Sequence, residues 1–97
     1  MRIIAKRTLQ KFWGKHGDSK ESLLSWYEEV KKAHWDYPQD LLAKYPNVRT
    51  IPKDRAIFNI KGGRYRLVVA IDYFRKVVYI KFIGTHNDYD KINALEV

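Results

Sequence analysis

The amino-acid sequence predicts an α+β fold, because helical and strand-like patterns occupy different parts of the chain. Apolar residues recur at helical spacing within residues 1–45, whereas residues 55–84 form short runs that alternate between the two faces of a strand. A Gly-Gly pair separates two of these runs, as in a hairpin. Helices followed by an antiparallel meander favour one sheet with the first two helices packed on one face. The expected order is β-α-α-(short α)-β-β-β-α.

Three helices are expected in the first half, after a short strand over residues 2–5. The first begins at Lys6 and weakens near Gly14 and Gly17. Asp18 or Ser19 is expected to cap the second, with Asp18 and Glu21 at the spacing of a capping box. A third, short helix begins at Pro38, since proline suits the first helical turn.

Three strands are expected over residues 55–61, 64–72 and 76–83, with Gly62 and Gly63 as a two-residue turn and a helix over the last dozen residues. Val48 to Lys53 is interpreted as a connector. Strict alternation assigns one set of side chains to the core: Phe58, Ile60, Tyr65, Leu67, Val69, Ile71, Val78, Ile80 and Phe82. The same alternation turns Ile83 to the opposite face.

Length and composition exclude several classes of protein. A chain of 97 residues suits one domain, residues 1–97, and is too short for a doubly wound nucleotide-binding fold or a βα barrel, so no cofactor is expected. Cysteine is absent, which excludes disulfides and thiolate chemistry. The sequence shows neither a signal peptide nor an apolar run of membrane-spanning length. We expect a soluble, cytoplasmic protein without membrane contacts.

The charge balance indicates a polyanionic partner. There are 19 Lys and Arg residues against 11 Asp and Glu, a formal net charge of +8. Alternation places a cationic, aromatic-bearing set on one sheet face: Asn59, Lys61, Arg64, Arg66, Tyr79 and Lys81. Such a face suits RNA, since cations neutralise phosphates and rings stack on unpaired bases. The alternative is a solvated face whose charges protect the sheet edges from aggregation.

The motif GTHNDYD, residues 84–90, follows the last strand and carries a histidine, a tyrosine and two aspartates. Thr85 is expected to cap a helix that starts at His86, with Asp88 at the third position after the cap. The imidazole of His86 would then lie beside free backbone N–H groups and could transfer a proton. The alternative is a helix cap with an exposed, non-functional histidine.

Other chemistries have little support. The three histidines, His16, His34 and His86, lack metal-ligand spacing, so no metal site is expected. The run from Lys61 to Arg64 is too short for a phosphate-cradling P-loop.

Four segments together carry a family resemblance: MRIIAKRTLQKFW, SWYEEVKKAHW, AIFNIKGGRYRLVVAIDY and VVYIKFIGTHNDYDKI. The chain closely resembles the HigB family of type II toxins, small ribonucleases of the RelE/ParE-like superfamily, over nearly its whole length. The resemblance implies a RelE-like fold. It also implies metal-independent cleavage of mRNA in the ribosomal A site by attack of the RNA 2′-OH. An antitoxin of HigA type, with a helix-turn-helix domain, would hold the toxin inactive, and operator DNA would be bound only by their complex.

The same resemblance implies roles for individual residues. His86 matches a catalytic histidine and is assigned general acid/base work, while Arg66 matches an arginine that stabilises charge on the reacting phosphate. Tyr89 would stack on or orient the scissile nucleotide, and Asp90 would orient His86 or cap the structure. Lys61 and Lys81 would hold phosphate or ribosomal RNA. The paired histidines and acids of some relatives are absent here, so electrostatic stabilisation would carry more of the rate.

Two other functions remain open from the sequence. A non-catalytic module could use the basic face to bind RNA. A gyrase-targeting toxin of the same superfamily is the third alternative, although members of that branch are not expected to carry the GTHxxYD motif.

Overall fold

The computed structural model describes all 97 residues and confirms the predicted α+β class. The five strands form one sheet in the order β1-β5-β4-β3-β2, in which only the β1–β5 pairing is parallel. Along the chain the elements are β1 (Arg2–Ile4), α1 (Lys6–Lys15), a 3₁₀ turn (Gly17–Ser19), α2 (Lys20–Lys32), α3 (Pro38–Lys44), β2 (Arg49–Ile51), β3 (Arg55–Ile60), β4 (Tyr65–Asp72), β5 (Val77–Thr85) and α4 (His86–Tyr89).

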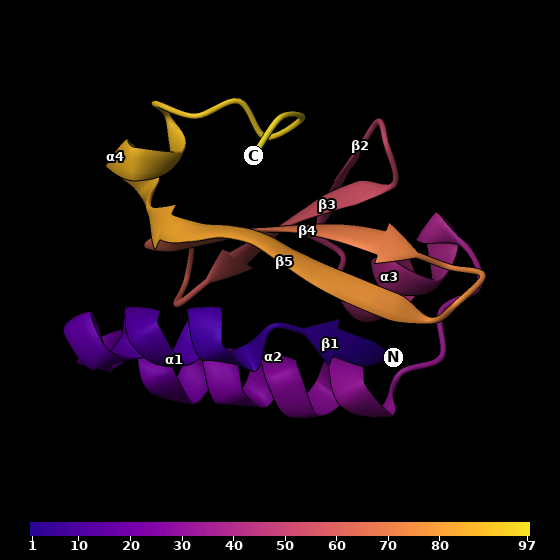
Figure 1. Cartoon of the computed structure of the whole chain (residues 1–97), viewed down its shortest axis with the longest axis horizontal. Coiled ribbons are helices and arrows are strands. Elements are labelled where there is room, and N and C mark those ends of the chain that lie inside the picture. The colour runs from indigo at the N-terminus through magenta and orange to yellow at the C-terminus, as the bar shows by residue number, and fades with distance from the viewer.

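Helices α1 and α2 lie along one face of the sheet, as predicted, and α4 and the C-terminus lie beyond the opposite face (Figure 1). The core forms between helices and sheet, where Leu9, Leu23 and Val30 meet Leu67 and Val69 with no exposed surface. Burial of these apolar side chains is the main force that fixes helices to sheet. We call the other side of the sheet the open face.

The start of α2 differs from the prediction. No side chain caps the helix: the hydroxyl of Ser19 donates to the His16 carbonyl at 2.7 Å, and the Asp18 carboxylate is bound by Arg64 and Tyr65 instead. The predicted capping box is therefore wrong, because tertiary partners take the Asp18 oxygens. The third helix is confirmed, with Pro38 in its first turn.

The hairpin between β3 and β4 closes with four residues, Lys61 to Arg64, rather than with the predicted Gly-Gly pair alone. Lys61, Gly62 and Gly63 have positive φ angles of 54°, 63° and 92°. The two glycines adopt a positive φ angle without steric cost. Lys61 is held at a positive φ angle by the geometry of the turn. Lys61 and Arg64 are consequently turn residues, and their predicted place on the face of the sheet is wrong.

A β-bulge at Lys81 reverses the predicted alternation in the second half of β5. Val69 pairs with Ile80 and Val68 pairs with Phe82, so Lys81 is an extra residue without a partner. Beyond it, Ile83 packs on the helix-side core, while Phe82 turns to the open face. The predicted inward Phe82 and outward Ile83 are both wrong, because an inserted residue exchanges the two faces of all that follows.

Two further segments depart from the prediction. The expected connector contains β2, which pairs with β3 from Arg49 to Ile51. The expected C-terminal helix stops at Tyr89, and the side chain of Asn93 accepts from the Leu95 N–H at 3.0 Å, a local turn that competes with helix.

The segment after α4 crosses the open face above β3. The pairing of Arg55 with Ala70 places its side chain on the open face, where the guanidinium donates to main-chain oxygens of Ala94 and Val97 at 2.8 and 2.9 Å. Lys53 adds a contact to the Leu95 carbonyl at 3.3 Å. None of the helices is both long and apolar enough to cross a membrane.

Candidate active site

A hollow of about 370 Å³ opens on the open face where β3 and β4 meet α4. It is lined by five residues predicted from the GTH motif and the sheet face, His86, Tyr89, Asp90, Arg66 and Asn59, together with three residues that were not predicted for the site, Asn47, Arg49 and Ile57. The residues come from four segments of the chain, so the sheet register and the position of α4 create the hollow. We call it the reaction hollow.

Arg66 and Asn59 form the floor of the reaction hollow, since they are directly paired across β3 and β4. The Arg66 guanidinium donates to the Gly63 carbonyl in the adjoining turn, which fixes the side chain. A side chain at Gly63 would come within 3.4 Å of that guanidinium. The turn therefore positions Arg66, and the remaining N–H donors of its planar fork suit a phosphate group.

The helix α4 places His86 and Asp90 at the rim. The Thr85 hydroxyl accepts the Asp88 N–H at 3.1 Å, which confirms the predicted cap. The side chains of His86 and Asp90 are 57% and 59% exposed, and Nε2 of the imidazole lies 3.8 Å from the Asp90 carboxylate. The ring is thus accessible to a large substrate and lies beside an acidic side chain.

Gly84 and Phe82 set the position of α4 over the sheet. The ring of Phe82, turned to this side by the bulge, covers Gly84 so closely that a Cβ there would lie 2.5 Å from the ring. The same ring lies 6.5 Å from the ring of Tyr89, at a tilt of 50°. A side chain at position 84 would therefore displace the Phe82 ring, which lies beside Tyr89.

Arg64 connects the helix layer to α4. Its guanidinium donates to the Asp18 carboxylate at 2.7 Å, and its carbonyl accepts the His86 N–H at 3.3 Å. The Tyr65 hydroxyl donates to the other Asp18 oxygen at 2.5 Å. The pKa of Asp18 is lowered mainly by this hydrogen bond and to a smaller extent by the contacts of Arg64. The same hydrogen bond raises the pKa of Tyr65. The cluster ties the beginning of β4 to the helices.

The structure does not gather all the predicted RNA contacts in one place. Tyr79 lies on the open face, paired with Ala70, and the ammonium group of Lys81 lies 5.7 Å from its ring centre. Neither residue lines the reaction hollow. Lys61 lies in the β3–β4 turn, near enough to Asp18 to lower its pKa, and Arg64 is engaged by the same carboxylate.

Arg49 is the cation that the sequence interpretation missed. It pairs with Ile57 at the start of β2, on the open face, and adds a second guanidinium to the reaction hollow. A signal was present in Val48-Arg49-Thr50-Ile51, whose alternation and β-branched residues are typical of a strand. Pro52 masked that signal, although proline is acceptable at the end of an edge strand.

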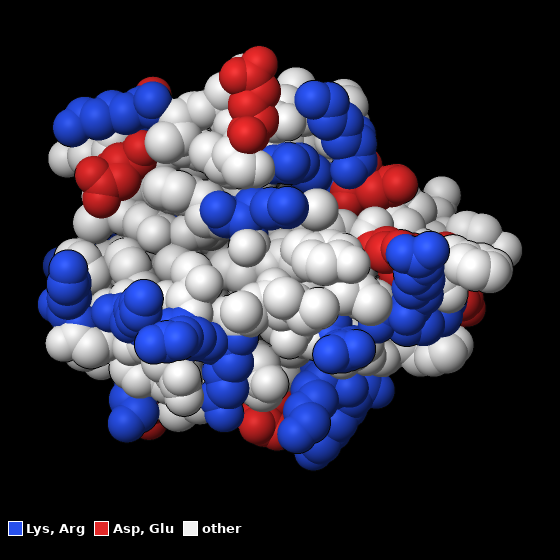
Figure 2. Space-filling model, viewed as in Figure 1, with Lys and Arg blue, Asp and Glu red and all other residues white.

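The arrangement combines two arginines, an imidazole, a phenol and a carboxylate in an open, polar setting. Guanidinium groups bind and stabilise a phosphate whose charge increases, and an imidazole moves protons near neutral pH. No three His, Cys, Asp or Glu side chains gather where a metal ion could be held. Basic side chains also outnumber acidic ones on the view in Figure 2, most densely along the lower half, where α1 and α2 lie in Figure 1.

Comparisons with known proteins agree with this chemistry. A family model described as "HigB_toxin, RelE-like toxic component of a toxin-antitoxin system" matches residues 19–92. The chain is 26% identical over 98 residues to "mRNA interferase toxin HigB" of Escherichia coli and to "mRNA interferase HigB" of Shigella flexneri; each match covers 98% of this chain and 93% of the relative. A further Escherichia coli "mRNA interferase HigB" is 23% identical over 94 residues, with 95% and 91% covered.

Proposed function

Because the chain belongs to the HigB family of RelE-like toxins, we propose that it is an endoribonuclease that cleaves mRNA at the reaction hollow. A toxin of this family has an antitoxin as its partner. The observation that carries the proposal is the hollow itself, which holds Arg49 and Arg66 beside an accessible histidine. The relatives that align over nearly the full chain are named for the same activity.

The reaction that suits these residues is an internal transfer within the RNA. The 2′-oxygen forms a bond to the adjacent phosphorus, and the bond from phosphorus to the 5′-oxygen breaks. The 2′-hydroxyl loses its proton, the leaving 5′-oxygen gains one, and the products are a 2′,3′-cyclic phosphate and a 5′-hydroxyl. His86 transfers a proton in this step, and Asp90, 3.8 Å away, orients the imidazole ring.

The two arginines bind the phosphate as its negative charge increases. Arg66 is held by the Gly63 carbonyl, so its remaining donors are oriented before substrate binds. Arg49 approaches from β2 as a second donor. Tyr89 orients the scissile nucleotide, and Asn59 contacts RNA at the floor of the hollow. Further along the sheet, Tyr79 and Lys81 contact the flanking RNA or ribosomal RNA, and Lys61 does so at the β3–β4 turn.

The proposal extends to the cellular setting. The toxin acts in the cytoplasm, on mRNA in the ribosomal A site, without a metal cofactor. Its antitoxin is of HigA type with a helix-turn-helix domain, and the complex binds operator DNA through that domain. The net charge of +8 supports association with the polyanionic ribosome.

A translation reaction tests the proposal. Purified wild-type protein is added to ribosomes that translate a defined mRNA, and new mRNA ends are mapped by primer extension. New ends within A-site codons are expected, and His86→Ala should abolish them while leaving the fold intact, because His86 is mostly exposed. Inhibited translation without new ends would instead indicate a non-catalytic RNA-binding module. Loss of gyrase activity without either effect would indicate a gyrase-targeting toxin.

A further inference from the structure

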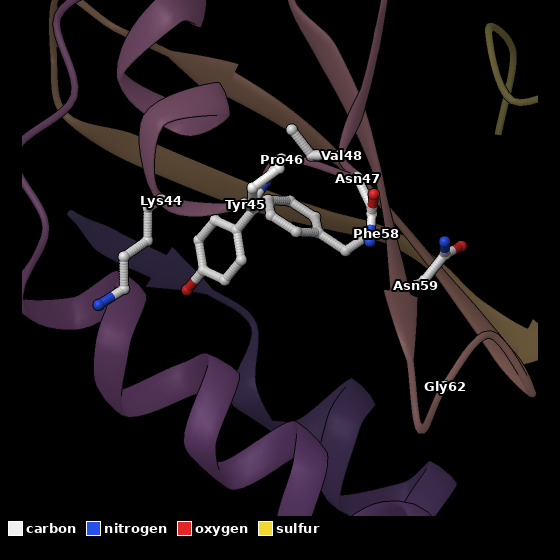
Figure 3. Close-up of a pocket in the computed structure, with 8 residues that line it drawn as sticks. All are labelled: Lys44, Tyr45, Pro46, Asn47, Val48, Phe58, Asn59 and Gly62. Atoms are coloured by element: carbon white, nitrogen blue, oxygen red, sulfur yellow. The ribbon is translucent and has the colours of Figure 1, made fainter.

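A second hollow lies next to the reaction hollow, around the edge of β3. It has a volume of about 370 Å³ and is lined by residues of the α3–β2 loop and of the β3–β4 hairpin, among them Lys44, Tyr45, Asn47, Phe58, Asn59 and Gly62. Figure 3 shows Tyr45 and Phe58 close together, with Asn47 and Asn59 to one side and Lys44 on the other. We call it the edge pocket.

The edge pocket and the reaction hollow share two residues. Asn47 and Asn59 line both. Between the two hollows lies the end of β3, where β2 no longer pairs with it: the pairing runs from Ile51 opposite Arg55 to Arg49 opposite Ile57 and stops there. Residues 58–60 therefore form a free strand edge, and a chain lying in the reaction hollow can pass around it.

The walls of the edge pocket are fixed by packing on the helix side. Phe58 is 2% exposed and lies 5.2 Å from the ring of Tyr45 at right angles. The Tyr45 hydroxyl donates to the Glu29 carboxylate of α2 at 2.6 Å, so the tyrosine ring is held from behind. A pocket with rigid walls can bind a ligand without the entropic cost of ordering them.

The chemistry of the lining favours a nucleobase. Asparagine amides offer a donor and an acceptor side by side, which matches the edge of a base, and Lys44 offers a cation for a neighbouring phosphate. The volume is near the lower end of the ~300–1,000 Å³ range of ligand pockets, which suits a small planar group. Single-stranded RNA presents unstacked bases that proteins read in this way.

We propose that the edge pocket binds the base of a nucleotide next to the scissile phosphate, so that the RNA bends around the free end of β3. This inference rests on the proposed mRNA cleavage. It makes Asn47 and Asn59 residues that recognise the substrate from both sides of the strand, and it makes Lys44 a phosphate contact outside the reaction hollow.

Crosslinking tests the path of the RNA. The cleavage site of wild-type protein is first mapped on mRNA in programmed ribosomes. The mRNA is then made with 4-thiouridine at the nucleotide on either side of the scissile phosphate and bound, uncleaved, with His86→Ala protein. After irradiation, one of the two nucleotides should crosslink to Lys44, Tyr45, Pro46 or Gly62, which line the edge pocket but not the reaction hollow. Crosslinks confined to other residues, or none, would overturn the proposal. If wild-type protein makes no cut, the proposed function fails instead.

A charge reversal provides a matched test. Lys44→Glu should lower the cleavage rate at limiting protein about tenfold, because it replaces a phosphate contact with a charge that repels the phosphate. It should also remove the crosslink to residues 44–46 without moving the cleavage site. Arg75→Glu is the control: it makes the same charge change in the β4–β5 turn, at the other end of the sheet, and its side chain is 75% exposed. Equal losses in the two variants would overturn the edge pocket, as would protection of residues 44–48 by the antitoxin but not by mRNA.

Discussion

The two halves of β5, on either side of Lys81, differ in which side chains face the helices. In the first half, Val78 and Ile80 face the helices and Tyr79 faces the open side, as strict alternation requires. In the second half the order is reversed, because the bulge at Lys81 inserts one residue without a partner. Phe82 then lies on the open face under Tyr89, and Ile83 joins the core.

This difference locates the active end of the open face. Before the bulge, the open face carries Tyr79, and the ammonium group of Lys81, the bulge residue, lies 5.7 Å from the Tyr79 ring centre; both residues lie outside the reaction hollow. After the bulge, the Phe82 ring lies on the open face against Gly84, and α4 places His86 in the same hollow as Arg66. The inserted residue thus separates the part of the open face that carries Tyr79 from the part that carries the reaction hollow.

The largest difference between the two ends is expected in catalysis. Arg66→Gln should lower the rate of mRNA cleavage by about 10²–10³-fold, since it removes a fixed cationic donor to the reacting phosphate. Lys81→Gln removes one charge from the other end and should change the rate by no more than about threefold, because an exposed cation contributes little individually. Single-turnover cleavage in programmed ribosomes measures both.

The unfolding midpoint of each variant is the control for this pair, since Arg66 also bonds the Gly63 carbonyl. Similar rates for Arg66→Gln and Lys81→Gln, with both proteins folded, would mean that the reaction does not occur in the hollow.

A smaller effect is expected from the glycine that accommodates Phe82. Gly84→Ala places a Cβ 2.5 Å from the Phe82 ring, so ring and helix must move, with a loss of about 1–3 kcal/mol in the free energy of unfolding. Gly14→Ala is the matched control: nothing lies within 4 Å of its Cβ, it is in the last turn of α1, and it should stabilise by no more than about 1 kcal/mol. Urea denaturation measures both values.

The double variant Gly84→Ala/Phe82→Ala sharpens this test. If the ring is the obstacle, the added loss from Gly84→Ala should largely disappear once Phe82 is already alanine. An unchanged loss would show that the backbone, and not the ring, requires glycine at this position.

The smallest effect is expected at acid pH, from the carboxylate that ties β4 to the helices. The pKa of Asp18 is lowered in the folded protein from an ordinary value of 3.8, chiefly by the Tyr65 hydroxyl and by Arg64. Its contribution to stability is therefore complete above about pH 4 and is lost as the pH falls through the lowered pKa. Asp18→Asn should flatten the dependence of the unfolding midpoint on pH below 4. A slope equal to that of wild-type protein would show that other carboxylates, such as Asp36 beside Lys76, cause the acid sensitivity.

Much of the fold could be predicted from local sequence patterns, because contacts with distant parts of the chain do not change the structure of those segments. Pro38 began its helix, Thr85 capped α4, and the helical faces of α1 and α2 reached the core. The bulge was not predictable, since Lys81 is an ordinary exposed strand residue and its insertion depends on pairing with β4. Asp18 does not cap α2 as expected, because its carboxylate is hydrogen-bonded by Arg64 and Tyr65 from a distant part of the chain.

The site was predictable where one motif supplied several residues. The GTHNDYD segment contributes His86, Tyr89 and Asp90 to a single hollow. Arg49 was missed because its strand is only three residues long and ends at a proline, so its place beside Arg66 depends on the pairing of β2 with β3. Strict alternation predicted too many basic residues on the open face, since Arg64 lies in a turn and is hydrogen-bonded to Asp18.

The most direct test of the separation between the two ends is a map of RNA contacts on the protein. A short single-stranded RNA, made uncleavable by 2′-O-methyl groups, is added to ¹⁵N-labelled protein, and amide chemical shifts are recorded. Changes should concentrate at residues 47–49, 59, 66 and 84–90, around the reaction hollow, and should be weak at residues 73–81. The largest changes at Tyr79 and Lys81, with His86 and Arg66 unaffected, would contradict the assignment of the reaction hollow as the site of cleavage.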